Sequence, residues 1–172
     1  ISRLVFLMGY SRFPHHWQEG LVTLDPSSGL PEALARTLAN VAARALEQGA
    51  LKGYVRVDRR LPVLRGRLRE SDQMRRFGLG LPLEVRFDEY SIDIAENQIL
   101  LAGVLKTLRM PGIPAPLRTT LQRLRVLLAD VSVPVRRPPW MPSRLNARYI
   151  PALTVAEMIL DGDSFELESG GL

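Results

Sequence analysis

The sequence predicts an α+β fold: a mostly helical domain with a small antiparallel β-ribbon or sheet at about residues 51–88, packed on helices. Apolar residues recur at helical spacing over residues 31–49, 94–109 and 116–130, but alternate with charged residues between positions 54 and 87. A length of 172 residues suits one domain or two small ones that share a core, and 46% hydrophobic residues suffice to build that core.

The first part of the chain carries one clear element. The apolar segment Leu4–Met8 is too short to distinguish a helix end from a buried strand, and Phe13–Trp17 is predicted to be a loop. The two histidines in that loop would need distant carboxylates to bind a metal, so a surface loop is the preferred interpretation. A helix is predicted from Pro31, with apolar residues at helical spacing until Gly49 ends it.

The next segment has the alternation of strands. Tyr54–Arg69, interrupted by a proline, predicts two strands that form a hairpin or ribbon, and Leu83–Phe87 predicts a third strand. Gly66 lacks a side chain, which would allow close backbone approach or a positive φ. We expect the flanking Arg65 and Arg67 to project to opposite faces. Either one arginine of the pair faces solvent or a partner, or Gly66 marks a bulge and the other arginine forms an internal salt bridge.

An acidic cluster precedes the second long helix. Asp93 and Glu96 have the spacing of a capping box, and acids in a first turn favour the helix dipole. With Asp88 and Glu89 they could also hold a metal, but we favour the capping interpretation because histidine and lysine partners are missing. Asn97 falls beside the apolar stripe of this helix and is expected to hydrogen-bond a neighbouring loop backbone.

The remaining elements are helical apart from one extended segment. A helix at about residues 116–130 follows a short Pro-Gly-Pro turn and should form an antiparallel hairpin with the helix before it. The prolines after Val133 exclude a helix interior, and Tyr149–Leu160 predicts a short final helix. We therefore expect a helical and β region at 1–132, a Pro- and Arg-rich linker at 133–148, and a short helix within 149–172.

The charge is concentrated in the β region. The net charge of +5 rests almost wholly on arginine, which prefers bidentate contacts with phosphates and carboxylates. Nucleic acid, an acidic protein surface or a nucleotide could each match this cluster, and plain solubility is the alternative. The clustered residues are Arg56, Arg59, Arg60, Arg65, Arg67, Arg69, Arg75 and Arg76.

Other chemistries are excluded by composition. Zero cysteines exclude disulfides, thiolate metal sites and thiol catalysis within the sequence. No apolar run approaches the roughly 20 residues of a membrane span, and we expect no leader, since the start lacks a basic-then-apolar pattern with a cleavage site. We expect a cytoplasmic protein.

A series of short motifs resembles a known family. The motifs are Gly53-Tyr54, then Arg65-Gly66-Arg67, then Phe87-Asp88-Glu89-Tyr90-Ser91-Ile92-Asp93, then Glu96-Asn97-Gln98-Ile99-Leu100. In this order and spacing they resemble the middle of an McrC protein, with a looser likeness at Leu4–Tyr10 and Tyr149–Leu160. McrC is the nuclease-bearing partner of the GTP-driven McrB motor in bacterial restriction systems that cut modified-cytosine DNA.

The resemblance implies a stalk or connector without catalytic residues of its own. Such a region docks on a hexamer of the McrB-type AAA+ GTPase, stimulates GTP hydrolysis and couples it to DNA cleavage by a nuclease domain elsewhere. We expect Asp88, Glu89, Asp93, Glu96 and Asn97 to be structural. The residues expected to bind the partner are Arg59, Arg60, Arg65, Gly66, Arg67 and Arg69.

The nuclease itself is expected outside these residues. In the family it is of the PD-(D/E)xK kind, in which carboxylates hold Mg²⁺ and a lysine of an acidic-x-Lys element lies near the attacked phosphate. The only lysines are Lys52 and Lys106, and the residues two positions before them are Ala50 and Val104. Because neither lysine completes the element, we expect a fragment with no metal or cofactor, Mg²⁺ in the missing nuclease domain and GTP on the partner. The first residue, Ile1, agrees with a fragment.

Two other functions remain as alternatives. The arginines could bind phosphates of DNA as a sequence-tolerant module, although no recognition helix with base-reading side chains is evident. A self-sufficient hydrolase is least favoured, since the sequence has no Gly-x-Ser-x-Gly, no phosphate-binding Gly-Lys-Ser/Thr loop and no thiol.

Overall fold

A computed structural model describes residues 29–76 and 80–169. The chain divides into two compact units, one of residues 1–51 with 95–172 and one of residues 52–94. Helices dominate the first unit and a three-stranded antiparallel sheet the second, so the predicted α+β class is confirmed. The predictions for Leu4–Met8 and the histidine loop lie outside the described residues.

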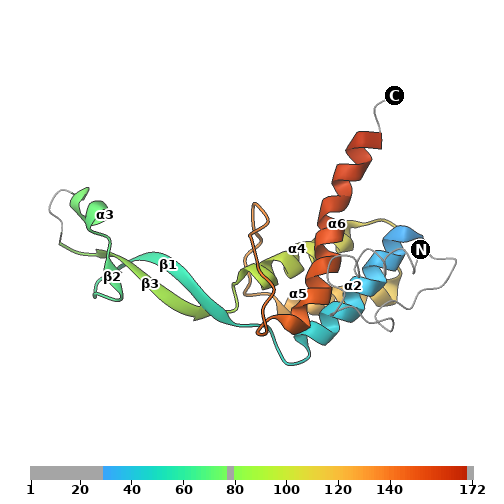
Figure 1. Ribbon diagram of the computed structural model, residues 1–172, viewed down its shortest axis with the longest axis horizontal. Helices are drawn as coiled ribbons and strands as arrows, with labels where there is room; N and C mark the ends of the chain where they lie inside the picture. Colours follow the sequence, from blue (N-terminus) through green and yellow to red (C-terminus); the bar gives the residue numbers. More distant parts are fainter. Residues whose placement is uncertain (1–28, 77–79, 170–172) are drawn as a thin grey trace. The chain divides into compact units, whose positions relative to one another are not determined.

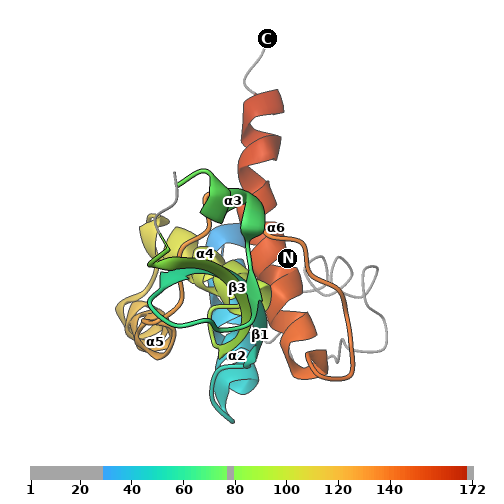
Figure 2. The ribbon, with the colours of Figure 1, turned by 90° about the vertical axis from the view of Figure 1, so that its left-hand side faces the viewer.

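The helical unit contains α2 (Leu30–Leu46), α4 (Ala95–Arg109), α5 (Ala115–Leu127), the short 3-10 helix η3 (Ala147–Tyr149) and α6 (Ile150–Ser169). Helix α2 packs on α5 and α6, and α4 packs on α5 and α6, as can be followed in Figures 1 and 2. No helix within residues 29–76 and 80–169 is long and apolar enough to cross a membrane.

Helix α2 forms as the sequence predicts. Gly29 is its N-cap, Pro31 lies in the first turn, and the chain leaves the helix through Gly49 at φ +84°. The Gly49 N–H donates to the Leu46 carbonyl at 2.8 Å. Leu38, Val41 and Ala45 of the predicted stripe are buried in the core.

The buried face of α4 differs from the apolar stripe that the sequence predicts at Ile94, Leu101, Leu105 and Leu108. Ile94 and Leu101 are buried, but Leu105 and Leu108 are only partly covered, and the buried face also includes Ile99, Leu100 and Val104. The difference arises because α4 packs against both α5 and α6, which covers more than one stripe. In α5 the predicted stripe is confirmed, because it is buried at Leu117, Leu121, Leu124, Leu128 and Val131.

Gly103 allows the backbones of α4 and α6 to pack closely. A β-carbon at Gly103 would lie 2.7 Å from the β-carbon of Ala156 on α6. The two helix backbones therefore pack closely at a position where any larger side chain would push them apart.

The sheet pairs its strands differently from the sequence prediction. Its strands are β1 (Gly53–Leu61), β2 (Arg67–Leu68) and β3 (Leu83–Ser91), in the order β1-β3-β2. The predicted hairpin within residues 54–69 is wrong, because β1 pairs with β3 along its whole length and β2 pairs with the other edge of β3. The third strand also runs to Ser91 rather than ending at Phe87. The short helix α3 (Glu70–Met74) follows β2 directly and packs on β3.

The proline-rich segment before η3 has no helix interior, as the prolines predict. Residues 133–143 contain no helix or strand. The Trp140 Nε1–H donates to Glu157 at 3.0 Å, and Arg137 forms an ion pair with Asp161 at 2.6 Å. Both partners lie on α6, so the segment runs along that helix. The predicted final helix is present, and it extends beyond Leu160 to Ser169.

Candidate functional site

One face of the sheet carries complementary pairs between β1 and β3. Side chains of directly paired residues project to the same side, so each pair on this face is a contact across the strands. We call this the charged face, and its β1–β3 pairs are Tyr54–Tyr90, Arg56–Asp88, Asp58–Arg86 and Arg60–Glu84. Every charged pair joins opposite signs, and the two tyrosine rings lie 5.2 Å apart between centroids.

The opposite face is apolar at its middle. Val85 and Phe87 are buried there, and Val57 is directly paired with Phe87. The guanidinium of Arg65 lies over the Phe87 ring, 4.2 Å from its centroid. A cation in this position is attracted by the ring and also shields it from water.

Gly66 brings the chain against β3. Its φ is +75°, and a β-carbon would lie 2.3 Å from the Arg86 carbonyl oxygen and 2.7 Å from the Phe87 β-carbon. Both sequence-based expectations for this glycine, a positive φ and a close backbone approach, are therefore confirmed. The two flanking arginines have different surroundings, because Arg65 covers Phe87 whereas Arg67 begins β2 and pairs directly with Arg86.

Asp58 is the centre of an ion-pair network on the charged face. It accepts two hydrogen bonds from Arg86, at 2.6 and 2.8 Å, and lies 3.3 Å from the Nε of Arg69. The hydrogen bond from Arg86, aided by the charge of Arg69, holds the pKa of Asp58 below its usual value, and the same bond raises the pKa of Arg86. Arg69 also forms an ion pair with Asp72 of α3.

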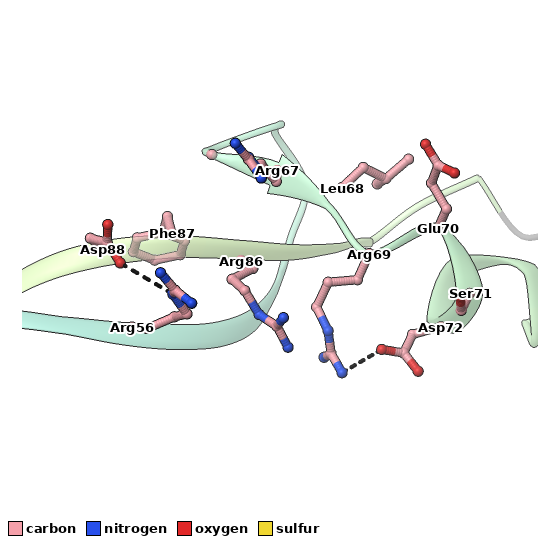
Figure 3. A pocket seen from close by; sticks show the side chains of 11 residues that line it. Arg56, Arg67, Leu68, Arg69, Glu70, Ser71, Asp72, Arg86, Phe87 and Asp88 are labelled. Atoms are coloured by element: carbon pink, nitrogen blue, oxygen red, sulfur yellow. Dashed lines mark ion pairs between the residues drawn. The ribbon is translucent and has the colours of Figure 1, made fainter.

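A hollow of about 680 Å³ lies beside this network. Figure 3 shows Arg69 and Arg86 projecting from the ribbon in the same direction, with Asp72 opposite Arg69. Arg56 and Asp88, 3.7 Å apart, line the hollow as well. Its other lining residues are Gly66, Arg67, Leu68, Glu70, Ser71 and Phe87.

The remaining predicted arginines pair with acids of their own sheet. Arg59 contacts Glu89 at 2.8 Å, and Arg60 contacts the buried carboxylate of Glu84 at 2.6 Å. Within residues 29–76 and 80–169, Arg67 is the one predicted partner-binding arginine whose side chain makes no ion pair, hydrogen bond or ring contact.

Glu89 and Glu96 of the family motif bind side chains within the fold. Glu89 pairs with Arg59 as described, and the Asp93 N–H donates to the Ser91 hydroxyl at 3.0 Å. The reciprocal half of the predicted capping box is wrong, because Glu96 accepts from the Asn146 amide at 2.8 Å instead of the Asp93 N–H. The described parts of the chain hold no cluster of three or more His, Cys, Asp or Glu that could bind a metal.

Asn97 and Tyr149 form hydrogen bonds with the backbone of Leu51, the residue immediately before the sheet unit. The Asn97 side chain donates to the Leu51 carbonyl at 2.8 Å, as the sequence predicts for a neighbouring loop, and the Leu51 N–H donates to the Tyr149 hydroxyl at 2.8 Å. Burial raises the pKa of Tyr149. The backbone N–H and the backbone carbonyl of Leu51 are thus both satisfied by buried side chains of α4 and η3.

Sequence reasoning missed several residues of the site. Asp58, Asp72 and Arg86 complete the network around the hollow, and Asn146 with Tyr149 completes the hydrogen bonds near Leu51. The alternating signs at every second position of β1 and β3 were the available signal for Asp58 and Arg86. Asp72 lies on α3 and Asn146 lies in the loop before η3. Neither segment has an apolar periodicity in the sequence that would have indicated it.

The comparisons with known proteins agree with the motif series. A family model described as McrBC 5-methylcytosine restriction system component matches residues 4–171. No curated protein matches the chain.

Two solved structures from Thermococcus gammatolerans are similar in fold. A chain of the cryo-EM structure of the McrBC complex is 23% identical with a TM-score of 0.61, over 90% of this chain and 50% of that one. A chain of the refined half-complex from a tetradecameric assembly of McrB AAA+ hexamers with bound McrC is 22% identical with a TM-score of 0.59, over 90% of this chain and 40% of that one. The chain thus spans half or less of the length of these two matched chains.

Proposed function

The chain belongs to the McrBC 5-methylcytosine restriction system component family, and we propose that it is the stalk of an McrC-like subunit. In this role it docks on an AAA+ GTPase of the McrB type and stimulates GTP hydrolysis. The observation that carries the proposal is the family match across residues 4–171. The sheet unit supports it, because it presents a charged face with an arginine that has no acidic partner among the described residues.

The chemistry of DNA cleavage is assigned to another part of the parent protein. We propose that the parent is a PD-(D/E)xK-type endonuclease subunit acting in the cytoplasm, with Mg²⁺ in a nuclease domain outside this chain. Neither Lys52 nor Lys106 follows an acidic residue at the spacing that such a site needs. The carboxylates of Asp58, Glu84 and Glu89 pair with arginines of the same sheet, which leaves them engaged in the fold.

GTP turnover tests the proposal directly. The AAA+ GTPase encoded with this protein should hydrolyse GTP faster when the folded chain is added to saturation. A chain that is folded but leaves turnover unchanged would remove the main support for a stalk.

A DNA-binding role is the alternative, and a measurement of duplex binding tests it. If the arginines bind phosphates, their loss should weaken binding to all duplex sequences equally and reduce the salt dependence of binding. The ion pairs on the charged face argue against this outcome, since they neutralise most of the guanidinium groups.

A further inference from the structure

We infer that the hollow on the charged face is a socket for a carboxylate side chain of a protein partner, and that Arg67 binds this carboxylate. The partner is an acidic segment of the AAA+ GTPase. The identity of the partner rests on the proposed function, whereas the chemistry of the socket rests on the sheet alone.

The first support is a like-charge pair at directly opposite positions. Arg67 of β2 pairs with Arg86 of β3, and both residues line the hollow. Like charges at such positions destabilise a sheet, because the side chains project to the same face a few ångströms apart. Arg86 is balanced on its other side by Asp58, at 2.6 Å. The charge that remains without an acidic partner is therefore that of Arg67.

The second support is the contrast with the other arginines of the hollow. Arg56, Arg69 and Arg86 each form an ion pair with an aspartate. Arg67 makes no ion pair and donates no side-chain hydrogen bond within the part of the chain that the structure describes. Residues that break a local rule of sheet pairing without a compensating contact are expected at functional positions.

The third support is the acidic rim, which distinguishes a single carboxylate from a nucleic acid. Glu70, Asp72 and Asp88 also line the hollow. Against the four arginines of the lining, these three acids leave one net positive charge, which suits one carboxylate better than a strand of closely spaced phosphates. One aspartate or glutamate side chain entering at Arg67 avoids these acids and can accept two parallel N–H bonds from the guanidinium.

The rest of the charged face has the composition of a protein interface. Tyr54 and Tyr90, side by side on the same face, are 78% and 60% exposed. Tyrosine and arginine are the residues enriched where protein partners bind most tightly, and they are placed here on rigid paired strands. Gly66 adds rigidity, since its close packing on Arg86 and Phe87 fixes the position of β2 and so of Arg67.

The first test measures the socket without any partner. The Nε–H signals of the arginines are followed by NMR while sodium acetate is added, with sodium chloride and inorganic phosphate at matched ionic strength for comparison. We expect saturable shifts at Arg67 and Arg86 with acetate, and none with chloride. In the variant Arg67→Gln these shifts at Arg86 should vanish, whereas Arg123→Gln, which removes an equal charge from α5, should leave them unchanged. Equal responses to acetate and chloride would overturn the inference, and so would a stronger response to phosphate than to acetate.

The second test measures binding to the AAA+ GTPase by calorimetry. Loss of one charge-assisted hydrogen-bonded contact should weaken binding roughly tenfold to a hundredfold in Arg67→Gln. The thermal midpoint of this variant should equal or exceed that of the wild type, because the like-charge pair is gone. Arg123→Gln should bind normally.

The outcomes separate the two proposals. If the wild-type chain binds the GTPase and Arg67→Gln binds equally well, the socket is wrong and the stalk role stands. If the wild-type chain does not bind at all, the stalk role fails, and the acetate titration alone decides the socket. Tight binding of duplex DNA that depends on Arg67 would show that this arginine binds a phosphate rather than a carboxylate, and would overturn the inference.

Discussion

Replacement of Gly66 by alanine should unfold the edge of the sheet, because two separate costs fall on one residue. The φ of +75° is a left-handed conformation that costs an alanine roughly 1–2 kcal/mol. The new β-carbon would also lie 2.3 Å from the Arg86 carbonyl oxygen and 2.7 Å from the Phe87 β-carbon. Neither contact can be relieved by a flexible side chain, so β2 must move away from β3, at a further cost of roughly 1–3 kcal/mol.

Two other glycines separate these costs. Gly112 also has a φ of +75°, but a β-carbon there would meet nothing within 4 Å, so Gly112→Ala should show the conformational cost alone. A β-carbon at Gly80 would likewise meet nothing, and its φ lies outside the left-handed range, so Gly80→Ala should be nearly neutral. We therefore expect the loss of stability to increase in the order Gly80, Gly112, Gly66, with Gly66→Ala losing about 2–5 kcal/mol.

Amide hydrogen exchange provides the assay. The Arg69 N–H donates to the Glu84 carbonyl at 2.7 Å, so its protection reports whether the chain after β2 stays on β3. Gly66→Ala should abolish this protection while the amides of α5 keep theirs, and a urea titration gives the free energies of all three variants. If Gly66→Ala keeps the Arg69 protection and loses no more free energy than Gly112→Ala, the close approach of Gly66 to β3 is not what holds β2.

Three further changes test other contacts. Gly103→Val should lower the free energy of unfolding by roughly 1–3 kcal/mol or more, because its β-carbon would lie 2.7 Å from that of Ala156; Gly80→Val is the control, and equal urea midpoints would contradict the close packing of α4 on α6. Tyr149→Phe should lose about 1–3 kcal/mol in the same assay by leaving the Leu51 N–H without its acceptor, and an unchanged midpoint would show that water replaces the hydroxyl. Because its folded pKa is lowered, Asp58 stabilises the fold above its ordinary value of 3.8, and this stabilisation is lost as the pH falls towards the folded value. Arg69 protection measured between about pH 5 and pH 2 should therefore decline more steeply in the wild type than in Asp58→Asn, and equal declines would contradict the role of the Arg86 bond.

The helices could be predicted from the sequence because their signals are local. Pro31 and Gly49 bound α2, and the apolar spacing of α5 gave its buried face without error. The buried face of α4 was only partly predicted, since two neighbouring helices cover it and a single stripe cannot describe that. The pairing of the strands depends on contacts distant in sequence. The pairing of Gly53 with Ser91 leaves no local trace in the sequence between them.

The candidate site was likewise predicted only in part from the sequence. Gly66 and its two arginines could be recognised because a glycine between charged residues has few structural explanations. The different roles of the two arginines could not be predicted from the sequence. Arg65 reaches Phe87, and Arg67 lies opposite Arg86, only because β2 pairs with β3. The neutralisation of Arg59 and Arg60 by Glu89 and Glu84 likewise depends on the β1–β3 pairing.

The measurement that tests the stalk role most directly is site-specific photo-crosslinking to the AAA+ GTPase. A photoreactive amino acid is placed at Val63, between β1 and β2, or at Val126 on α5, which are 70% and 71% exposed. The account predicts a GTP-dependent crosslink to the GTPase from position 63 that exceeds the one from position 126. An equal yield from both positions, or no crosslink from position 63 in a chain shown to be folded, would contradict docking through the sheet unit.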